Sequence, residues 1–169
     1  MGNNDTIEEL SAALVAELLS AGKSVSAAES CTGGWIAKSI TDIAGSSGCF
    51  AYGIVSYSNG AKESLLAVSP VTLQQHGAVS EQTVLEMAEG CIKLSGADLS
   101  IAVSGIAGPD GGSDEKPVGT VWFGWGVREG ANITSVAELR RFEGDRDQVR
   151  SHTVIAALQG LRERLRDHG

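Results

Sequence analysis

Hydrophobic and polar positions along the first part of the chain predict a helix followed by a strand. The apolar residues of the helix recur every fourth position and share one face: Leu10, Leu14 and Leu18. Thr6 and Glu9 have the spacing of a capping box at the start of this helix, and Gly22 ends it. Residues 24–29 then alternate sufficiently in polarity to form a short strand.

The same patterns predict the rest of the secondary structure. They indicate helices at 33–43 and 59–67, a short helix or turn at 70–77, a helix from Ser80, a final helix at 145–166, and strands at 50–58, 97–105, 118–127 and 132–142. Residues 106–117 form a long loop with Pro and Gly breakers. Helices alternate with strands until a final hairpin, which predicts an α/β fold with a mixed sheet and helices on both faces. No linker or repeat interrupts this order, so we expect residues 1–169 to form a single domain.

Composition excludes several classes of function. The chain has 21 acidic and 13 basic residues, for a net charge of -8, which argues against nucleic-acid binding. Its three cysteines lack CxxC spacing and fit a reducing compartment rather than a disulfide framework or a zinc site. No segment is long and apolar enough to suggest a membrane span, so we expect a cytoplasmic protein.

Three predicted loops that leave the carboxyl ends of strands contain polar or glycine-rich sequences. They follow Glu29, Tyr57 and Ser104. Ligands in open α/β sheets bind beyond the carboxyl ends of the strands, and extra glycine often marks close approach of backbone to a ligand. The sequence therefore predicts a site where these three loops meet.

The first loop, in "AESCTGG", has three interpretations. Ser30 or Thr32 could cap the following helix by accepting N–H bonds from its first turn. Alternatively, the free N–H groups of that turn could bind an anion or a developing oxyanion. Ser30 could also be a nucleophile at the strand end, with Cys31 as a rival that has no histidine nearby in sequence. Glu29 would orient a basic side chain or anchor the junction.

The second loop, in "YSNGAK", offers a base for Ser30. The three histidines of the chain have no obvious acid or nucleophile as partner, so a Ser–His arrangement is not indicated. Lys62 could serve instead if burial or a nearby cation lowered its pKa from the reference value of about 10.4. Tyr57 could relay the proton. The alternative is that Lys62 has no catalytic role and is a solvated lysine after an ordinary turn.

The third loop, in "SGIAGPDGG", suggests an anion nest. Gly105 and Gly108 follow a strand directly and could present backbone donors, with Lys116 and Arg146 as countercharges. The alternative is a flexible surface connection. No Walker A pattern is present, and the acidic residues of the loop do not have EF-hand spacing, so we predict no metal.

Taken together, the stretches "AESCTGG", "GIVSYSNGAKESLLAV", "HGAVSEQTVLEMAEG" and "VSGIAGPDGGSDEKPVGTVWFG" resemble the CinA C-terminal family of nicotinamide mononucleotide deamidases. The resemblance runs from about Leu10 to Leu161. It implies a three-layer α/β/α sandwich with a mixed sheet of about five strands. It also implies hydrolysis of the carboxamide of nicotinamide mononucleotide, with no cofactor.

The resemblance also assigns roles to residues. Ser30 is expected as the nucleophile, Lys62 as the general base and Tyr57 as an aid to proton transfer, with helix N–H groups after Gly33 as oxyanion donors. Ser104 is expected to contact the substrate and Arg146 its phosphate. The full set of expected substrate-binding residues is Glu29, Cys31, Thr32, Gly33, Gly34, Asn59, Ser104, Gly105, Gly108 and Arg146.

Two other functions stay open at this point. The same loops would serve a non-catalytic nucleotide-binding module, and the competence-related name of the family suggests a partner protein in DNA uptake or repair. The acidic net charge argues against direct DNA contact, so the partner protein in DNA uptake or repair is the less favoured of the two functions. Trp122 and Trp125 lie on opposite faces of one predicted strand, so we expect one in the core and the other at an edge or subunit contact, and we expect a homodimer.

Overall fold

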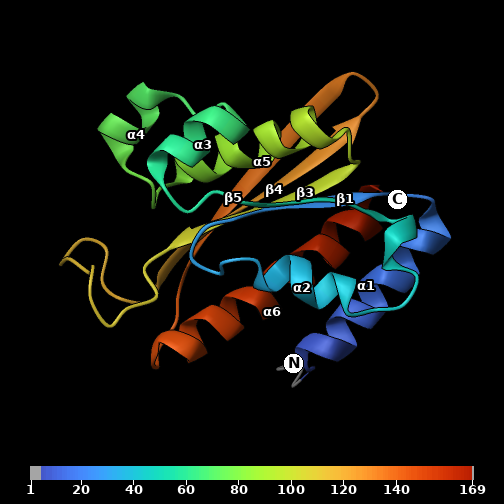
Figure 1. The fold of residues 1–169 in the computed structure, drawn as a ribbon, viewed down its shortest axis with the longest axis horizontal. Helices are drawn as coiled ribbons and strands as arrows, with labels where there is room; N and C mark the ends of the chain where they lie inside the picture. The colour runs from blue at the N-terminus through green and yellow to red at the C-terminus, as the bar shows by residue number, and fades with distance from the viewer. Residues whose placement is uncertain (1–4, 169) are drawn as a thin grey trace.

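A mixed sheet of five strands separates two layers of helices (Figure 1). The computed structural model describes residues 5–168. Its elements in chain order are α1 (Ile7–Ala21), β1 (Val25–Glu29), α2 (Trp35–Thr41), η1 (Ser46–Gly48), β2 (Phe50–Val55), α3 (Asn59–Leu66), α4 (Pro70–His76), α5 (Glu81–Ser95), β3 (Leu99–Gly105), β4 (Thr120–Glu129), β5 (Asn132–Arg141) and α6 (Arg146–His168). The α/β/α sandwich predicted from the sequence is confirmed.

The strand order β2-β1-β3-β4-β5 places the functional loops together. Strands β2, β1 and β3 run parallel, whereas β4 and β5 pair antiparallel as the predicted hairpin. The chain moves from β1 to β2 on one side and then crosses to β3 on the other. The strand order therefore reverses at β1, and ligands of such sheets bind in the crevice beyond a reversal of this kind.

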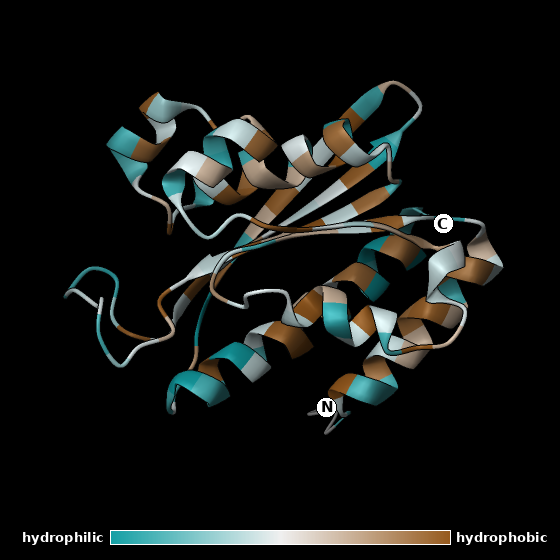
Figure 2. Cartoon of the chain, viewed as in Figure 1, coloured by the Kyte–Doolittle hydropathy of each residue, from teal (hydrophilic) through white to brown (hydrophobic). Residues whose placement is uncertain are grey.

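Hydrophobic residues fill both sides of the sheet, and Figure 2 shows them along the strands and on the adjoining helices. Helices α1, α2 and α6 lie on one face, and α3, α4 and α5 lie on the other (Figure 1). Strand β1 is buried along its whole length because helices cover both of its faces. Small residues such as Ala27 and Ala28 let those helices approach it closely.

Two element boundaries differ from the sequence prediction near the site. Helix α2 begins at Trp35 rather than at 33, because Gly33 and Gly34 adopt left-handed backbone angles, with φ of 59° and 102°. Strand β2 ends at Val55, because Ser58 already caps α3 by accepting the N–H of Ala61. Both differences lengthen the loops that leave the carboxyl ends of strands.

The two tryptophans of β4 occupy different environments. Trp125 is fully buried in the core between the sheet and α6, and its indole N–H donates to the Ala157 carbonyl at 3.3 Å. Trp122 is half-buried against the cluster on the opposite face. The predicted division between the two faces is therefore present, and the homodimer stays a prediction.

Candidate active site

The carboxyl ends of β1, β2 and β3 open into a cleft with a volume of about 300 Å³. This volume is at the lower end of the range for small-molecule sites. The cleft is lined by Ser30, Cys31, Tyr57, Asn59, Lys62, Ala78, Val79, Ser104, Gly105, Ile106, Ala107, Gly108, Asp110, Gly111 and Arg146. All three loops selected from the sequence therefore meet at one place.

Ser30 and Lys62 come from opposite sides of the cleft and contact each other. Ser30 follows β1 directly, and Lys62 lies in the first half of α3. The Nζ atom of Lys62 is 3.1 Å from the Ser30 hydroxyl oxygen and donates to the Ser56 carbonyl at 2.7 Å. A serine hydroxyl within hydrogen-bond reach of an amine is the arrangement that a Ser–Lys nucleophile requires.

The surroundings of Lys62 favour its neutral form. Its side chain is only 1% exposed, and burial lowers its pKa from the usual lysine value because a low-dielectric interior disfavours the ammonium. Within residues 5–168, no carboxylate forms a salt bridge with it. A buried lysine without a counterion loses its proton more readily than a solvated one, and this favours a role as a base.

Glu29, rather than Thr32 or Ser30, caps helix α2. Its buried carboxylate accepts the N–H groups of Ile36 and Ala37 at 2.8 and 3.0 Å, and the Thr32 hydroxyl donates to it at 2.7 Å. The predicted cap at Thr32 is therefore wrong, because its hydroxyl is a donor here. Of the two roles considered for Glu29, the structure supports the anchor of the junction.

Most of the first-turn N–H groups predicted to bind an oxyanion are already engaged, and within residues 5–168 only that of Gly34 has no acceptor. Ile36 and Ala37 donate to Glu29, Trp35 donates to the Thr32 carbonyl at 3.1 Å, and Gly33 donates to the Ser30 carbonyl at 3.0 Å. In the described part of the chain, no hydrogen bond joins the N–H of Cys31 to another residue. Cys31 lines the cleft next to Ser30, so its N–H is the better candidate donor.

The Cys31 thiol does not have the properties of a nucleophile. It is 6% exposed, and burial raises its pKa to about 12, with a smaller contribution from the Glu29 carboxylate. A thiol with this pKa is almost wholly protonated at neutral pH, whereas the thiolate is the reactive form. Ser30 is therefore the stronger of the two candidates.

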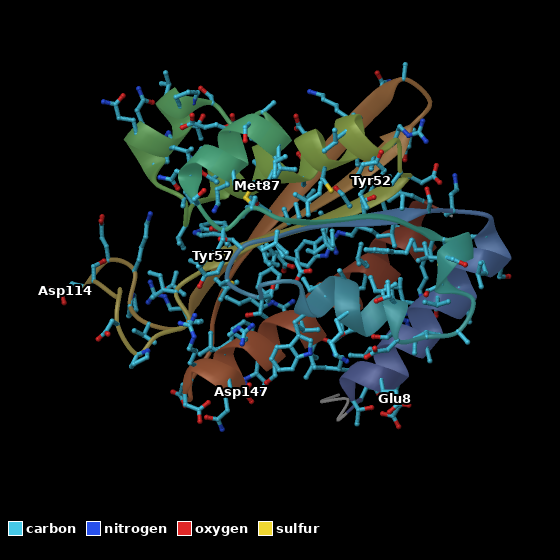
Figure 3. All side chains as sticks on the ribbon, in the orientation of Figure 1. Glu8, Tyr52, Tyr57, Met87, Asp114 and Asp147 are labelled. Carbon is cyan, nitrogen blue, oxygen red and sulfur yellow. The ribbon has the colours of Figure 1, made fainter. Side chains whose placement is uncertain are left out.

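Arg146 and Tyr57 hold the open side of the cleft together. Arg146, at the start of α6, donates to the Gly108 carbonyl at 2.7 Å and to the Tyr57 hydroxyl at 3.2 Å. Tyr57 is 60% exposed, and Figure 3 shows it at the end of the sheet that faces the loop bearing Asp114. Its hydroxyl thus contacts Arg146, and no hydrogen bond joins it to Lys62 in the described residues.

The glycine-rich third loop contributes the far wall of the cleft. Ser104, Gly105 and Gly108 line it as the sequence suggested. Lys116 was a predicted countercharge, but it lies outside the lining and donates to the His76 carbonyl at 3.0 Å. Arg146 is therefore the cation of this wall. Within residues 5–168, no group of three His, Cys, Asp or Glu side chains is placed to hold a metal ion.

Some of the remaining predicted residues line the cleft and others lie behind it. Asn59 lines the cleft, whereas Glu29, Thr32, Gly33 and Gly34 form the junction behind it and do not line it. Sequence reasoning missed the side chains of Ala78, Val79 and Asp110, together with other wall residues. Ala78 and Val79 are apolar and gave no chemical signal, and Asp110 was considered only as a metal ligand.

One arginine behind the junction was also missed. Arg150 donates to the carbonyls of Cys31 and Thr32, both at 3.1 Å. It lies four residues after Arg146 on the same side of α6, and this helical spacing is a signal that could have identified it.

No helix of the described residues is long and apolar enough to cross a membrane.

Known proteins match this chain over nearly all of its length. It is 54% identical over 162 residues to the nicotinamide-nucleotide amidohydrolase PncC of Enterobacter agglomerans, which covers 95% of this chain and 97% of that protein. It is 56% identical over 140 residues to the protein of the same name from Escherichia coli K12, with 83% of each chain covered.

A solved structure and a family match agree with these relatives. The competence damage-inducible protein A of Klebsiella pneumoniae superposes with a TM-score of 0.92 at 39% identity, over 98% of this chain and 100% of that one. The CinA C-terminal domain family matches residues 7–165, so the resemblance stated from the motifs is confirmed. The family model, the relatives and the solved structure agree over nearly the whole length of the chain. The chain therefore belongs to the CinA C-terminal domain family.

Proposed function

We propose that this protein is a nicotinamide-nucleotide amidase that converts nicotinamide mononucleotide to nicotinic acid mononucleotide and ammonia. The observation that carries the proposal is the 3.1 Å contact between Ser30 and the buried Lys62, which has no salt bridge in the described residues. The substrate follows from the relatives, which are named nicotinamide-nucleotide amidohydrolases. The proposed steps use no metal ion or organic cofactor.

Acylation begins with attack of the Ser30 hydroxyl oxygen on the carboxamide carbon. Neutral Lys62 accepts the hydroxyl proton as the new C–O bond forms. The negative charge that develops on the carboxamide oxygen lies next to the free N–H of Cys31, which stabilises it. Collapse of this intermediate breaks the C–N bond, and Lys62 returns its proton to the departing nitrogen, which leaves as ammonia.

Deacylation repeats these steps with water. Lys62 accepts a proton from water as its oxygen attacks the nicotinoyl ester on Ser30. The ester C–O bond then breaks, Ser30 regains a proton from Lys62, and nicotinic acid mononucleotide leaves. A single base serves both half-reactions, since Lys62 is neutral again at the end of each.

The outer part of the cleft is suited to the rest of the substrate. Arg146 uses two contacts for Gly108 and Tyr57, and a guanidinium has five N–H donors, so others are free for a phosphate. Ala78 and Val79 supply apolar surface for the pyridine ring. Anchoring the phosphate far from Ser30 would hold the carboxamide in position for attack.

Ammonia release from nicotinamide mononucleotide tests the proposal. Purified protein is expected to release ammonia in the absence of added metal, and Ser30→Ala is expected to lose at least about 10³-fold in kcat. A Ser30→Ala variant with near-normal kcat would contradict the nucleophile. Tight calorimetric binding of the mononucleotide without turnover would indicate a non-catalytic nucleotide-binding module instead.

A further inference from the structure

Arg150 of α6 packs behind the loop that carries Ser30, on the side away from Lys62. Its Nε and Nη2 atoms donate to two successive carbonyls, those of Cys31 and Thr32, each at 3.1 Å. Its guanidinium carbon lies 5.5 Å from the centre of the Trp35 ring. A planar guanidinium that bonds two adjacent carbonyls fixes their orientation, and the aromatic ring holds the guanidinium in place.

Two peptide groups connect this guanidinium to the candidate oxyanion donor. In a trans peptide the C=O and N–H point in opposite directions. The Thr32 carbonyl, bonded by Arg150, shares its peptide with the N–H of Gly33, which donates to the Ser30 carbonyl at 3.0 Å. The Ser30 carbonyl shares its peptide with the N–H of Cys31. The chain of contacts therefore starts at Arg150 and ends at the free N–H in the cleft.

A positive charge at the start of this chain strengthens the donor at its end. Hydrogen bonds in series polarise one another, and the effect is larger in a low-dielectric interior. The guanidinium group of arginine is a cation in proteins. It draws electron density toward the Thr32 carbonyl, and the polarised peptides make the Cys31 N–H a better donor to a developing oxyanion.

The loop also needs an external restraint. Gly33 and Gly34 adopt φ of 59° and 102°, and glycine has the widest choice of backbone conformations. Glu29 fixes the start of α2, and its carboxylate bonds Thr32, Ile36 and Ala37. Arg150 bonds the carbonyls of Cys31 and Thr32, in the loop between β1 and α2. Donors that are held in place before reaction cost no reorganisation in the transition state.

We propose that Arg150 is a positioning residue for acyl transfer, which orders and polarises the Cys31 N–H through the Thr32 and Ser30 carbonyls. This inference rests on the proposed function, because it needs Ser30 to be the acylated residue. It assigns a role in rate to a side chain that does not line the cleft. A purely structural role would change stability without a selective effect on kcat.

The test compares Arg150→Ala and Arg150→Lys with a matched control, Arg164→Ala. Arg164 also lies in α6 and stacks on a tryptophan, with its guanidinium carbon 4.6 Å from the Trp125 ring centre, but it does not contact the Ser30 loop. We expect Arg150→Ala to lower kcat by about 50-fold with KM within about twofold, since loss of one oxyanion donor costs about 10²–10³. Arg150→Lys keeps the charge but loses the two-carbonyl contact, so a smaller loss is expected. Arg164→Ala is expected to keep the wild-type kcat.

Guanidinium rescue separates positioning from folding. A cavity of about 520 Å³ lined by Trp35 and Arg150 adjoins the loop and gives free guanidinium a route to the vacated position. Millimolar guanidinium is expected to restore part of the kcat of Arg150→Ala and to leave Arg164→Ala unchanged. Equal kcat losses in Arg150→Ala and Arg164→Ala, or an Arg150→Ala variant with wild-type kcat, would overturn the inference.

A second measurement distinguishes failure of this inference from failure of the proposed function. A fluorophosphonate probe forms a bond between its phosphorus and an activated serine oxygen, with loss of fluoride, and it needs no nicotinamide nucleotide. Wild-type protein is expected to be labelled at Ser30, and Arg150→Ala more slowly by at least tenfold. Labelling at equal rates overturns the role of Arg150 whatever the natural substrate is. Ser30 labelling that depends on Arg150, without ammonia release from nicotinamide mononucleotide, would contradict only the proposed substrate.

Discussion

A carboxylate and an amine are buried on the two sides of the β1 carboxyl end, and their surroundings differ. On the α2 side, Glu29 is 0% exposed and its two carboxylate oxygens accept three hydrogen bonds. On the α3 side, Lys62 is 1% exposed, and its hydrogen bonds within residues 5–168 go to neutral oxygens, those of Ser30 and Ser56. A buried charge with matched partners stabilises local structure, whereas one without a counterion tends to become neutral and reactive.

This comparison makes opposite predictions for the two residues. Changes on the α2 side should act mainly on stability, because Glu29 holds the start of a helix. Changes on the α3 side should act mainly on rate, because Lys62 contacts the nucleophile.

The largest effect is expected from Lys62→Met. Loss of the base is expected to lower kcat for ammonia release by about 10³-fold, within the range for removal of a general base. The unfolding temperature should change by only a few degrees, since the substitution also removes the cost of a buried amine. Lys116→Met is a matched control, because Lys116 bonds the His76 carbonyl outside the cleft and should keep full activity. A Lys62→Met variant with more than a tenth of wild-type kcat would contradict the base assignment.

The pH dependence of kcat/KM should show the titration of Lys62. Burial lowers its pKa, and the neutral amine is the active form, so activity should rise about tenfold per pH unit up to that pKa and then level off. The levelling should occur below the pKa of about 10.4 of a free lysine. Initial rates of ammonia release across the alkaline range measure this. A limb that levels only at or above the free-lysine value would show that burial does not activate Lys62.

On the α2 side, Glu29→Ala should lower the free energy of unfolding by about 2 kcal/mol, because the buried N–H groups of Ile36 and Ala37 lose their acceptor. Urea denaturation followed by circular dichroism measures the loss. Glu29→Gln keeps one acceptor oxygen and should lose less. If Glu29→Ala is as stable as wild type, the carboxylate does not act as the cap of α2.

The smallest effect is expected from Tyr57→Phe. The substitution removes the hydroxyl that accepts a hydrogen bond from Arg146 at 3.2 Å. We expect a fall of about tenfold in kcat/KM, most of it through KM, because a hydrogen bond that involves a charged group contributes about 1.5 kcal/mol or more. Tyr52→Phe, on β2 and outside the cleft lining, is the matched control. A loss confined to kcat would instead support the proton-transfer role expected for Tyr57 from the family resemblance.

The sequence predicted the sheet and its loops because their signals are local. Alternation, helical spacing and the Thr6–Glu9 capping box each depend on nearby residues, and the capping box is present in α1. These elements then determine which strand ends meet. Ser30, Lys62 and Ser104 could therefore be assigned to one site before their contacts were known.

The errors share a different cause, since each involves partners that local spacing does not relate. Thr32 has a plausible position for a cap, but Glu29 reaches the first turn of α2 across two left-handed glycines. Lys116 lies in the loop of the cleft, but its side chain extends to His76. Arg150 lies 118 positions from Thr32, the carbonyl that it bonds. The contacts of Lys116 and Arg150 depend on tertiary packing, and that of Glu29 depends on the loop conformation that the two glycines adopt.

Capture of the acylated enzyme tests the central claim most directly. Wild-type protein would be mixed with nicotinamide mononucleotide, quenched in acid within milliseconds to seconds, digested and analysed by mass spectrometry. The account predicts a nicotinoyl nucleotide ester on the peptide that contains Ser30, absent from Ser30→Ala and greatly reduced in Lys62→Met. The account would be contradicted if the wild-type protein released ammonia but carried the ester on another residue. It would also be contradicted if Ser30→Ala formed as much ester as the wild type.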